Sequence, residues 1–525
     1  MYDCLILGGG LAGFMAAREI VSAGLRPLLV QDGQGASPWV HGFNVPVRKG
    51  DSADVFYNDT IASGQGLSNP ALAKALCGDA RTILDELEGM GLRFNRDGNE
   101  YQALRPLGAS FPRVVSIGNE TGAAVLARLR EQLAGKVDEL PKTRALRLLK
   151  RGERVCGALV YDTRSGIWRT LSAKAVVLAC GGFCGVYPMS TNKRDSGGDG
   201  IAMAYKAGAT LCDMEFIQFE PSGAVWPRSL IGTSMITTLF FEGAVLRNRE
   251  GERFMLRYGS EAERVGKDVL ARCIAAEINA GRGTGHGGVY FDATAVGRDT
   301  LERDYAMYVE RYRRVGIDLS KEPIEIAPMP HTSLGGVCID AAARTSVEGL
   351  FACGEVTGGL HGANRIGGSA GLETLVFGRR AGKSAAEYVR TASAEEPEEE
   401  PITHGDVSAA ATLTALRQRV QQSLWSALNA TRNGASLRRA IGDTLDCLRH
   451  IDALACGSDA ELFDKERLFN DTLTALLAMR SALARDGSLG CHVRSDAPNP
   501  QPLYRVVLRR RSRYETVIQK ESLNV

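Results

Sequence analysis

The stretch Asp3-Cys-Leu-Ile-Leu-Gly8-Gly-Gly10-Leu-Ala-Gly13 carries the pattern that decides the fold. Its first five residues are a mostly apolar run that predicts a buried strand, and the apolar spacing after the glycines predicts a helix. A second apolar run follows at residues 27–30. A GxGxxG turn between a strand and a helix lets the backbone approach a pyrophosphate at the helix N-terminus. The sequence therefore predicts a bound dinucleotide.

The turn residues expected to contact this dinucleotide are Gly8, Gly10, Leu11, Ala12 and Gly13. An acidic residue usually stands about 20 residues further on and binds the ribose hydroxyls. Gln31 occupies that place here, with Asp32 beside it, and either could serve. No arginine stands next to these two residues, so a cofactor with a 2′-phosphate is not indicated.

A second glycine-rich stretch, His-Gly-Ala-Asn-Arg-Ile-Gly-Gly-Ser-Ala-Gly-Leu-Glu-Thr, occupies residues 361–374. It follows a buried-strand pattern at residues 349–355 and precedes a helix predicted over residues 371–389. The unpaired amides and partial positive charge of a helix start suit the pyrimidine edge of a reduced, anionic flavin. Arg365, just before this helix, could hold a carboxylate over the flavin ring through two hydrogen bonds.

The chain has 525 residues, 60 of them glycine, and a net charge of +2. This length suits about two to four domains, and the charge indicates neither nucleic acid nor an anionic membrane as a partner. No apolar run is long enough to predict direct membrane insertion. The first strand is predicted to begin at residue 2 or 3, so we expect no signal peptide.

The twelve cysteines are scattered and include no C-x-x-C pair. This pattern argues against an iron–sulfur cluster or a structural zinc within the chain, and no metal site is predicted. In so long a chain, scattered cysteines are more typical of a reducing compartment than of a disulfide framework. We therefore expect a cytoplasmic protein.

Changes of pattern along the chain predict its organisation. Residues 33–66 are rich in glycine and polar residues and predict an ordered loop over a ligand, and residues 226–326 carry more charge and predict an inserted domain. Helices are predicted at residues 69–90, 121–135 (with Thr121 as the cap), 267–280, 407–432, 436–455 and 460–485, and strands near 144–161 and 170–180. The resulting segments are 1–225 and 327–392 for the first domain, 226–326 for the insertion, 393–406 for an acidic linker, 407–490 for a helical domain and 491–525 for a C-terminal tail.

The chain resembles the flavoprotein subunit family of fumarate reductase and succinate dehydrogenase, which also includes L-aspartate oxidase, over nearly its whole length. The motifs that carry the resemblance are the GxGxxG turn, Ala179-Cys-Gly-Gly182, Gly198-Asp-Gly200, Gly251-Glu-Arg-Phe-Met255, His331-Thr-Ser-Leu-Gly-Gly336, Gly354-Glu355, residues 361–374 and Gly490-Cys-His492. The resemblance implies an α/β fold: a Rossmann-like FAD-binding domain, an inserted, mobile α+β capping domain at 226–326 and a C-terminal three-helix domain.

The resemblance also implies which residues contact FAD. These are Ala179, Gly181, Asp199, Gly354, Glu355, Ser369, Gly371 and Leu372, with His361 as support facing the flavin. Covalent attachment in this family uses a histidine in a His-Thr or His-Ser pair. The histidine nearest to that place, His41, is followed by Gly42, so we favour non-covalent FAD.

Arg365 and His331 match the arginine and histidine that hold the substrate in this family. Both can donate charge-assisted hydrogen bonds to one carboxylate. The alternative is structural: Arg365 would pair with Glu355, and His331 would cap a turn. We interpret both as substrate-binding residues.

Other positions depart from the family pattern. Lys267 replaces the arginine that donates the proton, and Glu220 replaces a substrate-binding histidine; the further departures are Thr237, Phe240 and Ala109. A lysine changes its pKa readily when desolvated, so Lys267 could act as the acid or base. Glu220 would repel the second carboxyl group of a dicarboxylate. It could instead accept a hydrogen bond from an amine, a hydroxyl or Lys267 itself. Plain fumarate or succinate is therefore not the expected substrate, although Lys267 and Glu220 could also form a purely structural ion pair.

Three hypotheses about function follow. The first is an FAD-dependent oxidoreductase that transfers a hydride between flavin N5 and a small carboxylate-bearing substrate, as a dehydrogenase or an enoate reductase. The second is the flavoprotein subunit of an electron-transfer complex with an iron–sulfur partner, or an L-aspartate oxidase-like enzyme. The third is a flavin-binding module without catalysis, which the retained Arg365 and His331 argue against.

Overall fold

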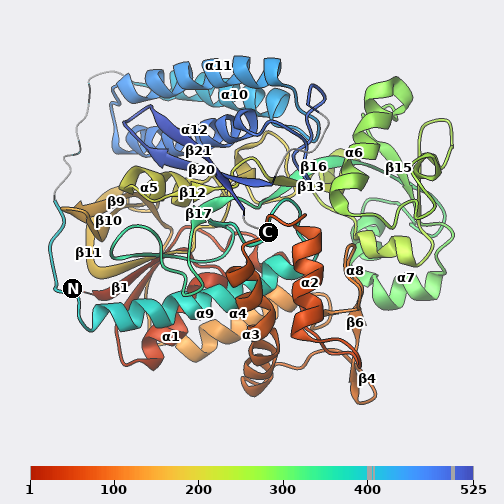
Figure 1. The fold of residues 1–525 in the computed structure, drawn as a ribbon, viewed down its shortest axis with the longest axis horizontal. Helices are drawn as coiled ribbons and strands as arrows, with labels where there is room; N and C mark the ends of the chain where they lie inside the picture. Colours follow the sequence, from red (N-terminus) through yellow and green to blue (C-terminus); the bar gives the residue numbers. More distant parts are fainter. Residues whose placement is uncertain (1, 399–401, 403–404, 406–407, 498–502, 524–525) are drawn as a thin grey trace.

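The computed structural model describes residues 2–398, 402, 405, 408–497 and 503–523 (Figure 1). The predicted strand–turn–helix–strand unit is present as β1 (Tyr2–Leu7), α1 (Leu11–Ser22) and β2 (Pro27–Gln31). The main sheet has the order β8-β2-β1-β11-β10-β9, and a seventh strand, β18, pairs with β11. These further strands are β8 (Asp138–Pro141), β9 (Thr143–Arg151), β10 (Arg154–Asp162), β11 (Ile167–Leu178) and β18 (Leu350–Ala352).

Helix α9 (Ser369–Val389) packs along α1, with α3 (Pro70–Gly89) and α4 (Thr121–Leu133) on the same side of the sheet (Figure 1). Two glycines of α9 allow the close approach. A Cβ atom on Gly378 would lie 2.6 Å from the backbone oxygen of Ala12, and one on Gly382 would lie 2.4 Å from that of Ala16. The second glycine-rich stretch is thereby fixed beside the first.

The segments between these elements correct two predictions. The expected loop at residues 33–66 contains the helix α2 (Ala53–Ser63), whose N-cap is Ser52. Thr121 is the first residue of α4 and not its cap; its hydroxyl oxygen accepts from Ile117 N and donates to His41 O. Short strands complete this region: β3 (Phe43–Asn44), β4 (Arg96–Asp97), β5 (Glu100–Tyr101), β6 (Ala103–Leu104) and β7 (Val114–Val115).

Residues 226–326, which we call the cap, form a separate lobe at the right of Figure 1 with a hydrophobic core of their own. Its antiparallel sheet has the order β13-β16-β15-β14. The long strands β13 and β16 reach from the cap into the Rossmann-like domain. The elements are β13 (Ile217–Trp226), β14 (Val245–Arg247), β15 (Val289–Asp292), β16 (Ile324–Ser333), α6 (Lys267–Glu277), which continues as a π-helical turn at Ile278–Arg282, α7 (Arg298–Asp304) and α8 (Ala306–Arg313).

The three predicted C-terminal helices are α10 (Ala410–Ala427), α11 (Gly434–Ala453) and α12 (Asp459–Ala484). Helix α12 packs against α5 (Asp199–Ala207), beside the first domain. The predicted acidic linker lies partly outside the described residues.

Residues 491–525, expected to form a tail, contain the hairpin β20 (Tyr504–Arg510) and β21 (Thr516–Ser522). The hairpin completes a five-stranded sheet in the order β19-β17-β12-β20-β21. Its partners are β12 (Leu211–Cys212), β17 (Gly336–Cys338) and β19 (Thr357–Gly358). Arg505 Nε also donates to the buried carboxylate of Asp213 at 3.0 Å, so these residues are part of the folded body.

Candidate active site

The GxGxxG turn has the geometry that requires glycine. Gly8 has a φ of 127°, and a Cβ atom there would lie 2.1 Å from Ala179 O. A Cβ atom on Gly13 would lie 1.9 Å from Gly8 O, where α1 leaves the sheet. Side chains at these positions would push apart the strand, the turn and the helix.

A cavity runs from this turn to the start of α9. Of the residues predicted to bind the cofactor, its lining includes Gly8, Gly10, Ala12, Gln31, Asp32, Ala179, Gly181, Asp199, Gly354, Glu355 and Gly371. Five other predicted cofactor contacts do not belong to the lining that the described residues form: Leu11, Gly13, His361, Ser369 and Leu372. Gly13 and Leu372 support the cavity from the helix interior, where both are buried.

The end of the cavity next to Gln31 and Asp32 contains an arginine that the sequence analysis missed. Arg144 of β9 donates to Asp32 at 3.2 Å and to Asp199 at 2.9 and 2.6 Å. Burial opposes the charge of Arg144, but the surrounding carboxylates outweigh it and raise the pKa of the guanidinium. The expectation that no arginine lies near Gln31 and Asp32 holds for the sequence but is wrong for the folded chain. This arginine is already paired with two carboxylates. Gln31 is held by Glu139 at 2.6 Å.

Glu355 and the start of α9 form the other end of the cavity. Glu355 accepts from Asn192 Nδ2 at 3.2 Å and from Ser333 N at 3.1 Å, and burial raises its pKa. His361 does not line the cavity, because its Nε2 pairs with Glu373 of α9 at 3.0 Å. The first-turn amides of α9, which lack partners within the helix, lie at this end.

Arg365 lies buried on the loop before α9, and only 6% of its surface is exposed. Its Nη1 donates to Ile366 O at 3.3 Å, whereas its Nε is buried with no hydrogen-bond partner. Burial lowers the pKa of the guanidinium. No carboxylate within the described part of the chain forms an ion pair with Arg365, so the alternative pairing with Glu355 is not present. Gln218 fixes the loop by donating to Arg365 O at 2.9 Å.

His331, at the inner end of β16, is fixed from one side by Thr191. The hydroxyl of Thr191 lies 2.9 Å from His331 Nδ1, and Asn192 Nδ2 donates to His331 O at 2.8 Å. Burial lowers the pKa of His331 to about 3, and the charges of Lys267 and Arg365 act in the same direction. The imidazole is therefore neutral at pH 7.

Lys267 and Glu220 form a direct ion pair. Lys267 is the first residue of α6, and its Nζ lies 2.5 Å from Glu220 Oε2 on β13. The other carboxylate oxygen accepts from Ser222 Oγ at 2.8 Å. Burial alone would raise the pKa of Glu220, but the Lys267 charge and these hydrogen bonds outweigh burial and lower it. The sequence left an amine, a hydroxyl or Lys267 as partners of Glu220, and in the structure Lys267 forms the ion pair.

Phe240 packs against Phe291 in the cap core, with ring centroids 5.0 Å apart. Thr237, which begins the same 3-10 turn, is buried nearby. Phe240, one of the departures from the family pattern, is thus part of the apolar core of the cap, and Thr237 is a buried polar residue near it.

His41 and Tyr308 form a contact that the sequence analysis missed. His41 Nε2 lies 2.7 Å from the hydroxyl of Tyr308 on α8. Desolvation by the surrounding protein, with the charges of Arg311 and Lys267, lowers the pKa of His41 to about 4 although its side chain is exposed, whereas burial raises the pKa of Tyr308. The only signal in the sequence is a histidine close to the first turn, at the place considered for covalent flavin attachment.

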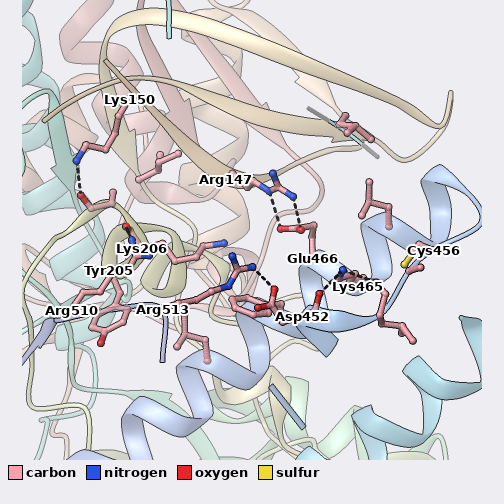
Figure 2. A pocket seen from close by; sticks show the side chains of 18 of the residues that line it. Arg147, Lys150, Tyr205, Lys206, Asp452, Cys456, Lys465, Glu466, Arg510 and Arg513 are labelled. Carbon is pink, nitrogen blue, oxygen red and sulfur yellow. Dashed lines mark hydrogen bonds and ion pairs between the residues drawn. The ribbon is translucent and has the colours of Figure 1, made fainter. Parts of the chain in front are cut away.

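A second cavity, of about 650 Å³, lies between β9, α5, α11 and α12 (Figure 2). Figure 2 shows Arg147 facing Glu466, to which it donates at 3.1 and 2.7 Å, and Lys465, whose Nζ donates to Asp452 O at 3.0 Å. None of the predicted site residues lines this cavity, so it is separate from the candidate active site.

Two further findings concern metals and membranes. In the described part of the chain, no group of three or more His, Cys, Asp and Glu side chains could hold a metal ion. Within the same residues, every helix is too short or too polar to cross a lipid bilayer.

Two family models match most of the chain. A model described as an FAD binding domain matches residues 3–370, and one described as the fumarate reductase flavoprotein C-terminal region matches residues 417–520. One of the subunits of fumarate reductase (CoM/CoB) from Methanothermobacter marburgensis is 36% identical over 524 residues, covering 96% of each chain. L-aspartate oxidase of Mycobacterium leprae is 33% identical and covers 95% of this chain and 93% of its own.

Solved structures agree with the family models. Mycobacterium smegmatis Sdh1 in complex with UQ1 superimposes with a TM-score of 0.85 and 28% identity, covering 100% of this chain and 94% of that chain. E. coli quinol fumarate reductase FrdA superimposes with a TM-score of 0.91 and 24% identity, covering 100% and 97%. At that identity, the second likeness concerns the fold alone.

Proposed function

This chain belongs to the flavoprotein family of fumarate reductase, succinate dehydrogenase and L-aspartate oxidase, and from that premise we propose that it acts on a small carboxylate-bearing substrate. It is an FAD-dependent oxidoreductase. When bound, the flavin supplies hydride transfer at its N5 atom. We propose that the substrate is a monocarboxylate or an enoate and not plain fumarate or succinate.

The residues of the long cavity fit FAD. The glycine turn allows a pyrophosphate to approach α1, and Asp32, fixed by Arg144, could accept hydrogen bonds from ribose hydroxyls. The amides at the start of α9 can donate to the pyrimidine edge of the flavin. We propose non-covalent binding, because Nε2 of His41 is already engaged by Tyr308.

Arg365 is the observation on which the proposed function depends. A buried guanidinium costs free energy unless an anion compensates it, and Arg365 has a buried Nε without a partner. A substrate carboxylate would supply the missing charge and accept two hydrogen bonds. His331 can donate a further one from Nε2, provided that Nδ1 accepts from Thr191.

Lys267 is the group that we propose to hold or move the proton at the carbon next to the one that exchanges the hydride. Glu220 holds its ammonium in place and disfavours a second carboxylate at this end of the site. Phe240 is buried in the core of the cap and adds no charge there. These features support a substrate with one carboxylate and a second end that carries no negative charge.

The test is an anaerobic screen of the holoenzyme with small carboxylic acids, amino acids and enoates, following flavin absorbance. At least one compound should bleach the oxidised flavin or reoxidise the reduced flavin. Arg365→Met should retain FAD and lose this response, while Arg379→Met, which removes a partly exposed arginine of α9 that pairs with Glu86, should retain it. An unchanged response in Arg365→Met would refute the proposed carboxylate site.

A second candidate is the flavoprotein subunit of an electron-transfer complex with an iron–sulfur partner. The relative from Methanothermobacter marburgensis is named as one subunit of a fumarate reductase, which favours this possibility. Purification from the native host under mild conditions should then yield a companion chain with iron–sulfur absorbance. An L-aspartate oxidase-like activity would instead produce hydrogen peroxide from L-aspartate and oxygen; Glu220 and Lys267 count against it.

A further inference from the structure

The contact between His41 and Tyr308 crosses from the Rossmann-like domain to the cap. His41 stands on a loop that is fixed at its backbone, since His41 O accepts from Thr121 Oγ1 and Val40 O accepts from Gly122 N at 2.8 Å. Tyr308 is buried on α8. Its hydroxyl lies 2.7 Å from His41 Nε2, so each side chain restricts the orientation of the other.

The hydrogen bond of the Tyr308 hydroxyl indicates which ring nitrogen of His41 carries the proton. Among the residues that the structure describes, the Tyr308 hydroxyl has no acceptor except His41 Nε2. A buried hydroxyl retains its hydrogen bond, so Tyr308 donates and His41 accepts. The single proton of a neutral imidazole then lies on Nδ1. No described residue accepts a hydrogen bond from this Nδ1–H, and the side chain of His41 is exposed. Lys267 and Glu220 lie near enough to His41 to influence its pKa.

A chain of contacts connects this pair to the proposed proton-transfer residues. Arg311, one turn after Tyr308 on α8, donates from Nη1 to Ser234 O at 2.9 Å. The adjacent Met235 O lies 2.5 Å from Ser222 Oγ, which is also within hydrogen-bond distance of Glu220. The helix that orients His41 is therefore fixed to the segment that supports the ion pair of Glu220 and Lys267.

We propose that His41 is a substrate-binding residue whose Nδ1–H donates to a neutral acceptor, such as a carbonyl or hydroxyl oxygen, on the end of the substrate that lacks the carboxylate. Tyr308 is its positioning residue. This inference rests on the proposed function, because Arg365 must hold the carboxylate. It narrows the substrate class to small acids that carry one carboxylate and one uncharged oxygen.

The experiment compares pairs of probes that differ only in the neutral oxygen. The probes are 4-oxopentanoate against pentanoate, and 5-oxohexanoate against hexanoate. Each is titrated into the oxidised holoenzyme, and its Kd is obtained from the change in flavin absorbance. The wild-type protein should bind at least one oxo acid about 10-fold more tightly than its parent acid, the effect of one added hydrogen bond in a desolvated site.

Three variants test the assignment. His41→Leu should abolish the preference for the oxo acid, and Tyr308→Phe should reduce it to about 3-fold, because the imidazole proton is then free to occupy either nitrogen. His41→Asn, whose amide NH₂ stands near the position of Nδ1, should retain most of the preference. The Kd of the parent acid should change little in all three variants. If His41 had only a structural role, its replacement would weaken binding of the parent acid and the oxo acid alike.

The possible failures are distinguishable. If the parent acids bind in an Arg365-dependent manner but the oxo acids show no preference, or keep it in both His41→Leu and Tyr308→Phe, the inference about His41 is wrong and the carboxylate site stands. If none of these acids perturbs the flavin spectrum although the anaerobic screen finds a carboxylate that reacts, the inference about His41 is wrong and the proposed function stands. If the screen also finds none, both fail. Should His41→Leu lose FAD, Tyr308→Phe alone decides the question.

Discussion

Lys267 begins α6 and holds Glu220, so its ammonium can serve the structure, proton transfer or both. If Lys267 transfers the proton, Lys267→Met should retain FAD and lose turnover by about 10²- to 10⁴-fold, the usual contribution of general acid–base catalysis. Steady-state rates measure this loss, with FAD occupancy taken from flavin absorbance. Lys383→Met, on the exposed side of α9, is the control and should keep its rate. Retained turnover would remove Lys267 from the mechanism.

His331 gives the protein a defined sensitivity to acid. Its pKa is about 3 in the folded protein and about 6.5 in an unfolded chain. Between these values the unfolded chain binds a proton at this site and the folded protein does not, so the free energy of unfolding falls as the pH falls from 6.5 toward 3. Urea midpoints at pH 7.5 and pH 5 should differ less in His331→Gln than in wild type, with exposed His450→Gln as the control. Equal acid sensitivity in the two histidine variants would contradict this assignment.

At the scale of the elements, the junction of β1 and α1 depends on the absence of a side chain at Gly13. A Cβ atom there would lie 1.9 Å from Gly8 O, which is backbone and cannot rotate away. Gly13→Ala should therefore lose most of its FAD and lower the melting temperature by several degrees, on the order of the 2–4 °C per kcal/mol expected for a large domain.

Gly78 of α3 offers a matched control, because a Cβ atom there meets no atom within 4 Å. Gly78→Ala should keep its FAD and gain roughly 0.5–1 kcal/mol from the better helix propensity of alanine. Flavin absorbance of the purified variants and thermal melts measure both effects. Full FAD occupancy in Gly13→Ala would show that the turn tolerates a side chain.

At the scale of the whole molecule, the FAD cavity joins four segments that are distant in sequence, near residues 7–40, 143–145, 179–199 and 353–374. Ligand binding to such a site stabilises only the folded chain. Removing FAD should lower the melting temperature, and adding it back should restore stability by about 2.7 kcal/mol at 100 times the Kd. Arg365→Met should recover equally, because Arg365 is not in the cavity lining. Identical melting of the apo and loaded proteins would contradict the assembly of this site from the four segments.

The fold was largely predictable because its signals are local. The glycine turn, the start of α3 with Asn69 as its N-cap and Pro70 as its first residue, and the periodic helices α9 to α12 each lie within one continuous stretch, and the predicted α/β fold is confirmed. The hairpin at Tyr504–Ser522 was missed because its strands are rich in charged residues on the exposed side and have no glycine turn. Helix α2 was missed because it lies between glycine-rich segments.

The site was predictable only where the family motifs mark it. Lys267 and Glu220 were identified as departures, but their pairing across 47 residues follows from the fold. Arg144 lies 112 residues from Asp32, so no local pattern could place it at that end of the cavity. His41 and Tyr308 are 267 residues apart and belong to different domains, so no local sequence pattern could predict their hydrogen bond.

The sheet that contains β12 and β20 has a consequence for synthesis on the ribosome. These paired strands are separated by 292 residues, from Cys212 to Tyr504. At about 5–20 residues per second, β12 waits roughly 15 to 60 s for this neighbour. During that interval its edge has unpaired backbone groups that can capture another chain. We therefore expect the nascent polypeptide to depend on chaperones until translation has passed β20.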